Sequence, residues 1–143
     1  MKKLLSVVTL LGCSLVLASP AMAIKQFNDQ FKELYAGEKA DKELVALITE
    51  AKCNVCHVQK ENKKVRNPYG EALHEMIEKD EFPVKEFKAD SKNEKLVERL
   101  NGLFKKVLDE KSGDEKHKTF AARMEAKLLP GGDTDGKGLG KKD

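Results

Sequence analysis

Residues 41–57, DKELVALITEAKCNVCH, decide how this chain is organised. The apolar side chains of the first eleven residues recur at the spacing of one helix face, at Leu44, Val45, Leu47, Ile48 and Ala51. This predicted helix runs directly into Cys53 and Cys56, and His57 follows at once. Two thiols and an imidazole therefore lie close together, at the end of an element whose apolar face can pack against a core.

The spacing of Cys53, Cys56 and His57 is the C-x-x-C-H pattern of c-type haem attachment. Two thiols one helical turn apart can each add to one haem vinyl group and form a thioether. The histidine next in line can then bind the iron. We therefore predict one covalently attached haem c, held by Cys53, Cys56 and His57, with His57 as an iron ligand.

Three other uses of the two cysteines stay open. A thioredoxin-like redox pair requires a βαβ pattern around the motif, whereas the flanking residues indicate helix and polar loop. A zinc site requires about four ligands, so His74 or His117 would have to join the motif. A disulfide across so short a loop would add little stability and would leave His57 without a role.

The first 23 residues have the layout of a secretory signal peptide. Lys2 and Lys3 precede an apolar stretch at 4–18, and Ala21-Met22-Ala23 forms a small-x-small cleavage site. The apolar stretch is shorter than the roughly 20 residues of a membrane span. Lipoprotein-type cleavage at Cys13 would leave the apolar residues 14–18 at the mature N-terminus. We predict cleavage after Ala23, and a periplasmic or secreted protein without a membrane span.

Cleavage there leaves 120 of the 143 residues, enough for one small domain, which we place at 24–130. The signal removes two of the 27 basic side chains and none of the 24 acidic ones, so the mature charge is +1. A nucleic-acid-binding protein would have a strong basic excess, and none is predicted as a partner. Residues 131–143, rich in glycine and lysine, are predicted to be a disordered tail.

Apolar periodicity predicts further helices over residues 24–35, 69–79, 93–111 and 119–129. The turn residues Asn67-Pro68-Tyr69-Gly70 precede the second of these, and a capping box at residues 91–94 precedes the third. Residues 80–90 are predicted to be an irregular apolar cover. No segment predicts a strand, so the expected fold class is all-α.

The polar loop at 58–67 carries Lys60, Lys63, Lys64 and Arg66. These cations can be a docking patch for an acidic partner or an ordinary solvated surface. We favour the second interpretation, because runs of charge are commonly just surface.

The motif at 53–57, the helix before it and the Asn-x-aromatic-Gly at 67–70 together resemble exported monohaem c-type cytochromes of the class I type. The resemblance covers most of residues 41–129, and its specificity rests almost wholly on the motif. It implies a small helical cytochrome c-like domain around one haem. We expect Tyr69 to pack near the haem, and an ordinary position in the core is the alternative for this residue. It also implies electron transfer with redox protein partners rather than an enzymatic activity. The helices at 24–35 and 93–111 are departures from the family plan.

The sequence offers several candidates for the second axial ligand of the iron. Members of that family usually provide a methionine from a loop well beyond the haem histidine. Met124 follows His57 by 67 residues, although within a predicted helix, and is the favoured ligand. Met76, His117, His74 and an open position are the alternatives. An iron closed by a second ligand is suited to electron transfer, whereas an open iron predicts a small-ligand binder or sensor.

Overall fold

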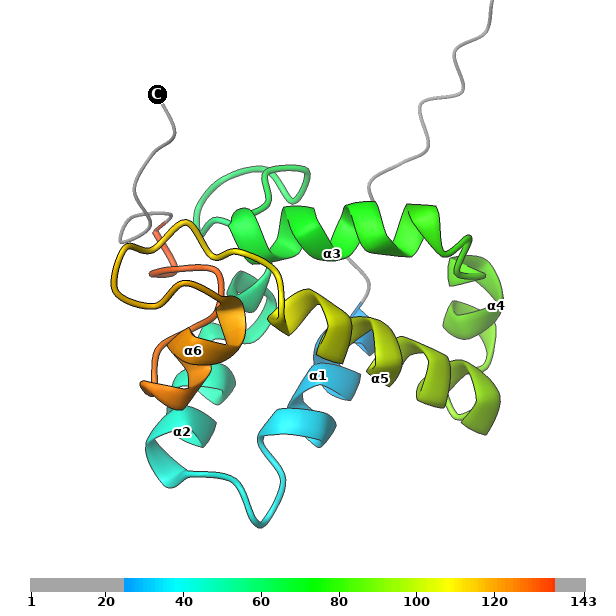
Figure 1. Ribbon diagram of the computed structural model, residues 1–143. Helices are drawn as coiled ribbons and strands as arrows, with labels where there is room; N and C mark the ends of the chain where they lie inside the picture. The colour runs from blue at the N-terminus through cyan, green and yellow to red at the C-terminus, as the bar shows by residue number, and fades with distance from the viewer. Residues whose placement is uncertain (1–24, 136–143) are drawn as a thin grey trace, which may run out of the picture.

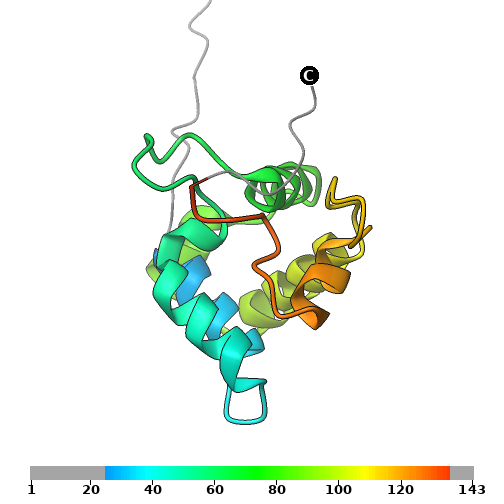
Figure 2. The same ribbon diagram turned by 90° about the vertical axis from the view of Figure 1, so that its left-hand side faces the viewer.

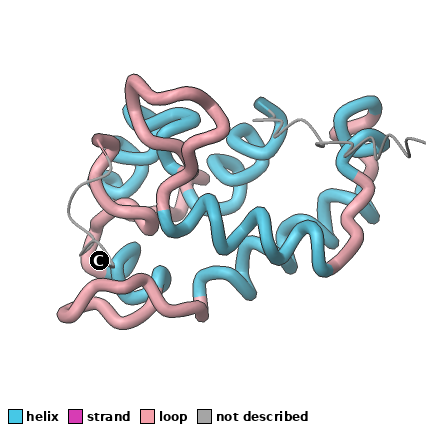
Figure 3. The backbone as a smooth tube through the Cα atoms, turned by 90° about the horizontal axis from the view of Figure 1, so that it is seen from above, coloured by secondary structure: helices cyan, strands magenta, loops and turns pink. Residues whose placement is uncertain are grey.

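The computed structural model describes residues 25–135, so the predicted signal peptide lies outside the described part. In chain order the helices are α1 (Lys25–Tyr35), α2 (Lys42–Ala51), the 3₁₀ helix η1 (Lys52–Val55), α3 (Pro68–Lys79), α4 (Val84–Ala89), α5 (Glu94–Leu108) and α6 (Phe120–Glu125). The β-type pairing in this part consists of two isolated bridges, His57 with Arg66 and Lys111 with Thr119 (Figure 3). The all-α prediction is confirmed.

The helices are arranged around α5, which packs against α1, α3 and α6, while α2 packs against α1 (Figure 1). The short α4 lies at the end of α3 and α5 that is remote from α6 (Figure 1). The predicted apolar stripe of α5 is buried at Leu100, Leu103, Phe104 and Val107. Burial of such side chains contributes about 1.5–3 kcal/mol each, so this stripe holds the other helices together. Within residues 25–135 we find no helix with the length and apolar character of a membrane span.

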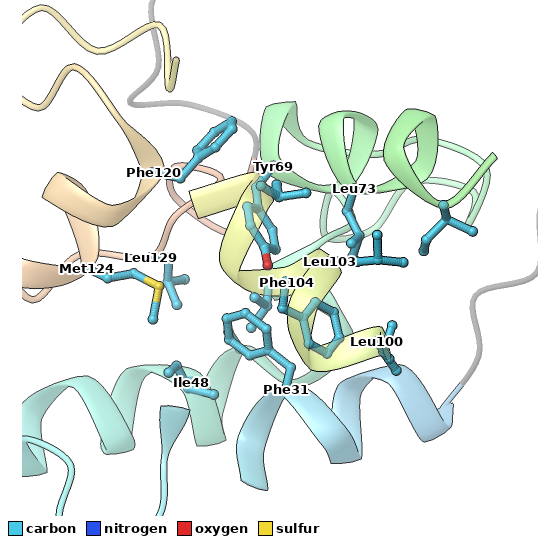
Figure 4. Packing of buried hydrophobic residues seen from close by; sticks show 14 of the residues in the cluster. Phe31, Ile48, Tyr69, Leu73, Leu100, Leu103, Phe104, Phe120, Met124 and Leu129 are labelled. Atoms are coloured by element: carbon cyan, nitrogen blue, oxygen red, sulfur yellow. The ribbon is translucent and has the colours of Figure 1, made fainter. Parts of the chain in front are cut away.

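Aromatic side chains from four helices meet in the centre of the core (Figure 4). The ring of Phe31 on α1 lies 5.5 Å from that of Phe104 on α5 and 5.8 Å from that of Tyr69 on α3, both edge to face. Phe120 at the start of α6 contacts Tyr69 in the same way, at 5.4 Å. Edge-to-face pairs add about 0.5–1.5 kcal/mol to the burial of the rings. These contacts fix α1, α3, α5 and α6 relative to one another.

A second aromatic group closes the opposite end of the core. Phe27 on α1 lies 5.6 Å from Phe87 on α4 and 6.0 Å from Phe82 in the preceding turn. The sequence pattern predicted irregular structure here, and the structure instead has the helix α4. With six residues, α4 is too short to show a recognisable apolar period in the sequence. The helix is stabilised instead by the burial of Phe87.

Two predicted helices end earlier than the sequence pattern indicated. The helix predicted over 93–111 ends at Leu108, because Lys111 already pairs with Thr119. The helix predicted over 119–129 ends at Glu125. There the amides of Leu128 and Lys127 donate to the carbonyls of Arg123 and Met124, which is a Schellman ending.

The start of α5 also differs from the prediction in its capping residue. The capping box expected at residues 91–94 would have placed Ser91 at the N-cap. In the structure the N-cap is Asn93, whose side chain accepts a hydrogen bond from the amide of Leu96. Asn is as good an N-cap as Ser, so the helix begins close to where it was expected.

The chain after α6 folds back towards the loop that connects η1 with α3 (Figure 2). Pro130, Gly131 and Gly132 are buried. The carbonyl of Thr134 accepts a hydrogen bond from the amide of Gln59 at 2.7 Å, and the Thr134 hydroxyl donates to Oε1 of Gln59 at 3.1 Å. Residues 131–135, which were predicted to belong to a disordered tail, are therefore packed against the domain. Residues 136–143 lie outside the described part.

We expect Gly102→Ala to stabilise the fold. Gly102 lies inside α5, and a Cβ built there meets no atom within 4 Å. Glycine in a helix interior costs about 0.5–1 kcal/mol relative to alanine, so the free energy of unfolding should rise by about that amount. Urea denaturation followed by circular dichroism measures the change, and a lower midpoint would contradict the packing of α5 described above.

Candidate cofactor site

A tight turn brings the two thiols and the imidazole of the motif together. Helix α2 ends at Ala51 and the 3₁₀ helix η1 carries the chain into Cys53. The carbonyl of Cys53 accepts hydrogen bonds from the amides of Cys56 and His57, at 3.2 and 3.1 Å. Both cysteines are free thiols, so the structure contains no disulfide between them.

All three motif residues line one cavity of about 460 Å³. This volume lies in the range of about 300–1,000 Å³ that is usual for cofactor and ligand sites. Both aromatic groups of the core contribute to its walls, together with the inner face of α3. The principal apolar wall residues are Phe27, Phe31, Leu73, Ile77, Phe82 and Phe104. The cavity therefore combines two thiols and an imidazole with a large apolar surface.

The same cavity also has charged and polar lining residues. Lys52, Arg66 and Lys85 are its cations, and Glu78 and Glu81 are its acids. The side chain of Arg66 is mostly buried and donates a hydrogen bond to the Glu71 carboxylate at 3.3 Å. The cavity therefore offers an apolar interior and cationic side chains, which are complementary to a flat apolar ligand that carries carboxylates.

His57 is buried, and its environment favours the neutral ring. Burial lowers the pKa of His57; the nearby carbonyl of Val65 partly opposes this shift, while Lys63 and Arg66 lower the pKa further. The buried Nδ1 has no hydrogen-bond partner among the described residues. A neutral imidazole is the form that binds metals, so His57 needs no proton release to act as a ligand.

The Cys56 thiol is also held in its uncharged form. Burial raises the pKa of Cys56 to about 12, and the neighbouring Cys53 adds to this effect while Arg66 opposes it. A thiol with so high a pKa is a poor thiolate nucleophile. The environment of Cys56 therefore differs from that of the low-pKa cysteines of thiol–disulfide enzymes.

The side chain of Asn67 connects the motif turn to α3. Its Nδ2 donates to the carbonyl of Val55 at 2.8 Å and to that of Asn54 at 3.3 Å, while its Oδ1 accepts from the amide of Gly70 at 2.9 Å. Its main-chain amide donates to the carbonyl of Cys56 at 3.0 Å. Asn67 is only 2% exposed, so this single residue satisfies buried backbone groups on both sides. The sequence indicated a turn here but not this role.

Two glycines allow this junction to close. A Cβ on Gly70 would lie 2.0 Å from the carbonyl oxygen of Cys56, and a Cβ on Gly131 would lie 2.3 Å from the side chain of Asn67. Real Cβ atoms do not approach other atoms so closely. Gly70 therefore lets α3 contact the motif turn, and Gly131 lets the C-terminal segment cover Asn67.

The structure places the other predicted site residues in different parts of the molecule. Tyr69 does not line the cavity; it is fully buried in the aromatic core, its hydroxyl has no partner among the described residues, and burial raises its pKa. Met124 is buried near Leu129 on the side of α6 and is not a lining residue (Figure 4). Met76 and His117 do not line the cavity either, whereas His74 does.

Within residues 25–135 no group of three or more His, Cys, Asp and Glu side chains is placed to hold a metal ion by itself. Comparisons with protein-family models, with curated proteins and with solved structures found no match for this chain. Its function must therefore be argued from the cavity.

We expect Asn67→Asp to destabilise the protein strongly. The aspartate keeps the acceptor for Gly70 but loses both donations to the carbonyls of Val55 and Asn54, and it buries a charge beside them. An unsatisfied buried group costs about 1–3 kcal/mol, and more when charged, so we expect a loss of at least about 2 kcal/mol by urea denaturation.

The matched control is Asn93→Asp, because Asn93 is an exposed N-cap whose acceptor an aspartate reproduces. This variant should keep its stability within about 0.5 kcal/mol, as surface substitutions usually do. Equal effects of the two variants would contradict the role assigned to Asn67.

We expect Gly70→Ala to separate α3 from the motif turn, because the added methyl group meets the Cys56 carbonyl. Overpacking of this kind costs about 1–3 kcal/mol. Thermal unfolding measures the loss, and Gly102→Ala is the control for the same chemical change in an open position. A Gly70→Ala protein as stable as the wild type would refute the close contact.

Proposed function

We propose that this protein is an exported monohaem c-type cytochrome that transfers electrons. The observation that carries the proposal is that Cys53, Cys56 and His57 all line one large, mainly apolar cavity. A C-x-x-C-H motif by itself can occur by chance. Here it opens into a space of cofactor size, with both thiols free and the imidazole neutral.

The chemistry of the lining residues fits a haem. Two free thiols are the groups from which thioethers to vinyl substituents are made, and His57 supplies a nitrogen ligand. The aromatic and aliphatic walls suit a macrocycle, and Lys52, Arg66 and Lys85 are available to its carboxylates. A zinc ion would need about four protein ligands, whereas in a haem the porphyrin supplies the equatorial ligands and the protein only the axial ones.

When bound, a haem supplies a reversible one-electron iron couple. The residues of the chain contribute the position of the ligand His57 and the apolar surroundings of the cofactor. Asn67 holds the motif turn against α3, so His57 has a fixed direction. Phe27, Phe31 and Phe82 line the cavity and would shield a bound haem from water, which is one of the factors that tune a reduction potential. The proposed role is electron transfer rather than catalysis.

The partners in this proposal are other redox proteins outside the cytoplasm. The sequence layout at residues 1–23 supports export, and haem attachment to this motif takes place on exported c-type cytochromes. The loop at 58–66 borders the site, since the amide of Val58 donates to the carbonyl of Val65 directly beside His57. Its Lys60, Lys63 and Lys64 are exposed, and an acidic redox partner could meet them near the cofactor.

We expect the motif variants to lose covalent haem when the full chain is expressed in cells that possess a c-type maturation system. Cys56→Ala should reduce covalent loading strongly, and His57→Ala should abolish a stable holoprotein. The measurements are haem staining after denaturing electrophoresis, intact mass and the pyridine haemochrome spectrum. Cys13→Ser changes only the predicted signal peptide, so it should give the same mature chain and keep full loading.

Wild-type protein without covalent haem under these conditions would refute the proposed function. Covalent haem combined with rapid binding of carbon monoxide by the untreated reduced protein would instead support the alternative, a small-ligand binder or sensor with an open iron.

A further inference from the structure

We propose that His74 is the second axial ligand of the iron, so that the site is closed by two histidines. This inference rests on the proposed function and goes beyond it, because it identifies the ligand on the other face and thereby the class of chemistry. His57 and His74 are the two histidines of residues 25–135 that line the cavity.

The position of His74 on α3 follows from the contact between that helix and the motif. Gly70 is held against Cys56, and His74 lies one helical turn further along, about 6 Å in rise. The cavity-facing row of α3 runs from Gly70 through Leu73 and His74 to Ile77. His74 is thus the first residue after the motif contact on this wall that can donate a nitrogen lone pair.

The present contact of His74 does not hold it away from this role. Its Nε2 lies 3.4 Å from Oε1 of Glu78, the side chains being 33% and 65% exposed. An exposed pair of this kind contributes only about 0–1 kcal/mol, so the ring can turn at little cost. Glu78 also lines the cavity and lies one helical turn after His74 on α3. Its carboxylate is therefore close to the ring nitrogen of His74 that would not bind the iron. Carboxylates commonly orient metal-bound histidines through that nitrogen.

The competing ligands are engaged elsewhere in the fold. Nδ1 of His117 lies 3.0 Å from the carboxylate of Asp114, which also pairs with the buried Arg123. Met124 packs in the apolar core and Met76 against it, and neither lines the cavity. Lys52 and Lys85 do line it, but as cations they suit the carboxylates of a haem rather than its iron.

Two imidazoles leave no open coordination position. His74 then excludes the ligand-binding alternative and makes the protein an electron carrier. A site with two histidine ligands has a lower reduction potential than one with a histidine and a methionine, since a methionine ligand raises the potential. The partners would accordingly be redox proteins of low potential.

The test uses haem-loaded full-length protein and three variants: His74→Ala, His74→Met and Met124→Leu. We expect the wild type to be low-spin by electronic absorption and electron paramagnetic resonance, without the charge-transfer band of a methionine ligand. His74→Ala should become high-spin or water-ligated and bind carbon monoxide when reduced, with unchanged covalent haem. Added imidazole should restore its low-spin spectrum. His74→Met should raise the potential, and Met124→Leu should leave spectrum and potential unchanged.

A low-spin spectrum that survives His74→Ala, or one that is lost in Met124→Leu, would overturn the assignment of His74 while leaving the proposed function intact. A high-spin spectrum of the wild-type protein would also overturn the assignment of His74 while leaving the proposed function intact. Wild-type protein without covalent haem would overturn both proposals together, so the two failures are distinguishable by haem content.

Discussion

The buried carboxamide of Asn67 is the interaction on which the site depends. It bridges the motif turn and the first turn of α3 through three side-chain hydrogen bonds. In the low dielectric of the interior these bonds are strong, and the backbone groups they satisfy would be costly to leave unpaired. The direction of His57 and the position of the α3 wall are therefore set by one residue, not by two separate elements.

Distant parts of the chain protect this junction. Gly131 covers Asn67, and the route of that segment is fixed by Arg123, whose Nε donates to the carbonyl of Leu129 at 2.9 Å. Arg123 in turn pairs with Asp114, which is hydrogen-bonded to His117 as well. The charge of this buried arginine is thus compensated, as buried charges require. The region after α5 serves to hold the C-terminal segment over the motif.

The cavity results from a division of the aromatic residues into two groups. Phe31 and Phe104 belong to the group at the centre of the core, and Phe27 and Phe82 to the group closed by Phe87 on α4. The cavity is lined by these four aromatic residues together with the two cysteines and His57. Aromatic packing therefore stabilises the helices and at the same time shapes the space proposed for the cofactor.

The sequence by itself determined the helical class, because apolar spacing at Leu100, Leu103 and Phe104 reflects local backbone geometry. It also determined the three motif residues, because their chemistry depends on neighbours along the chain. Only the tertiary structure decided which of His74, Met76, His117 and Met124 reach the cavity, that Tyr69 lies in the core, and that Asn67 joins two elements. The physical reason is that these roles depend on how α3 and α6 pack against the rest, and no local pattern records which helix face will meet a space that the other helices enclose.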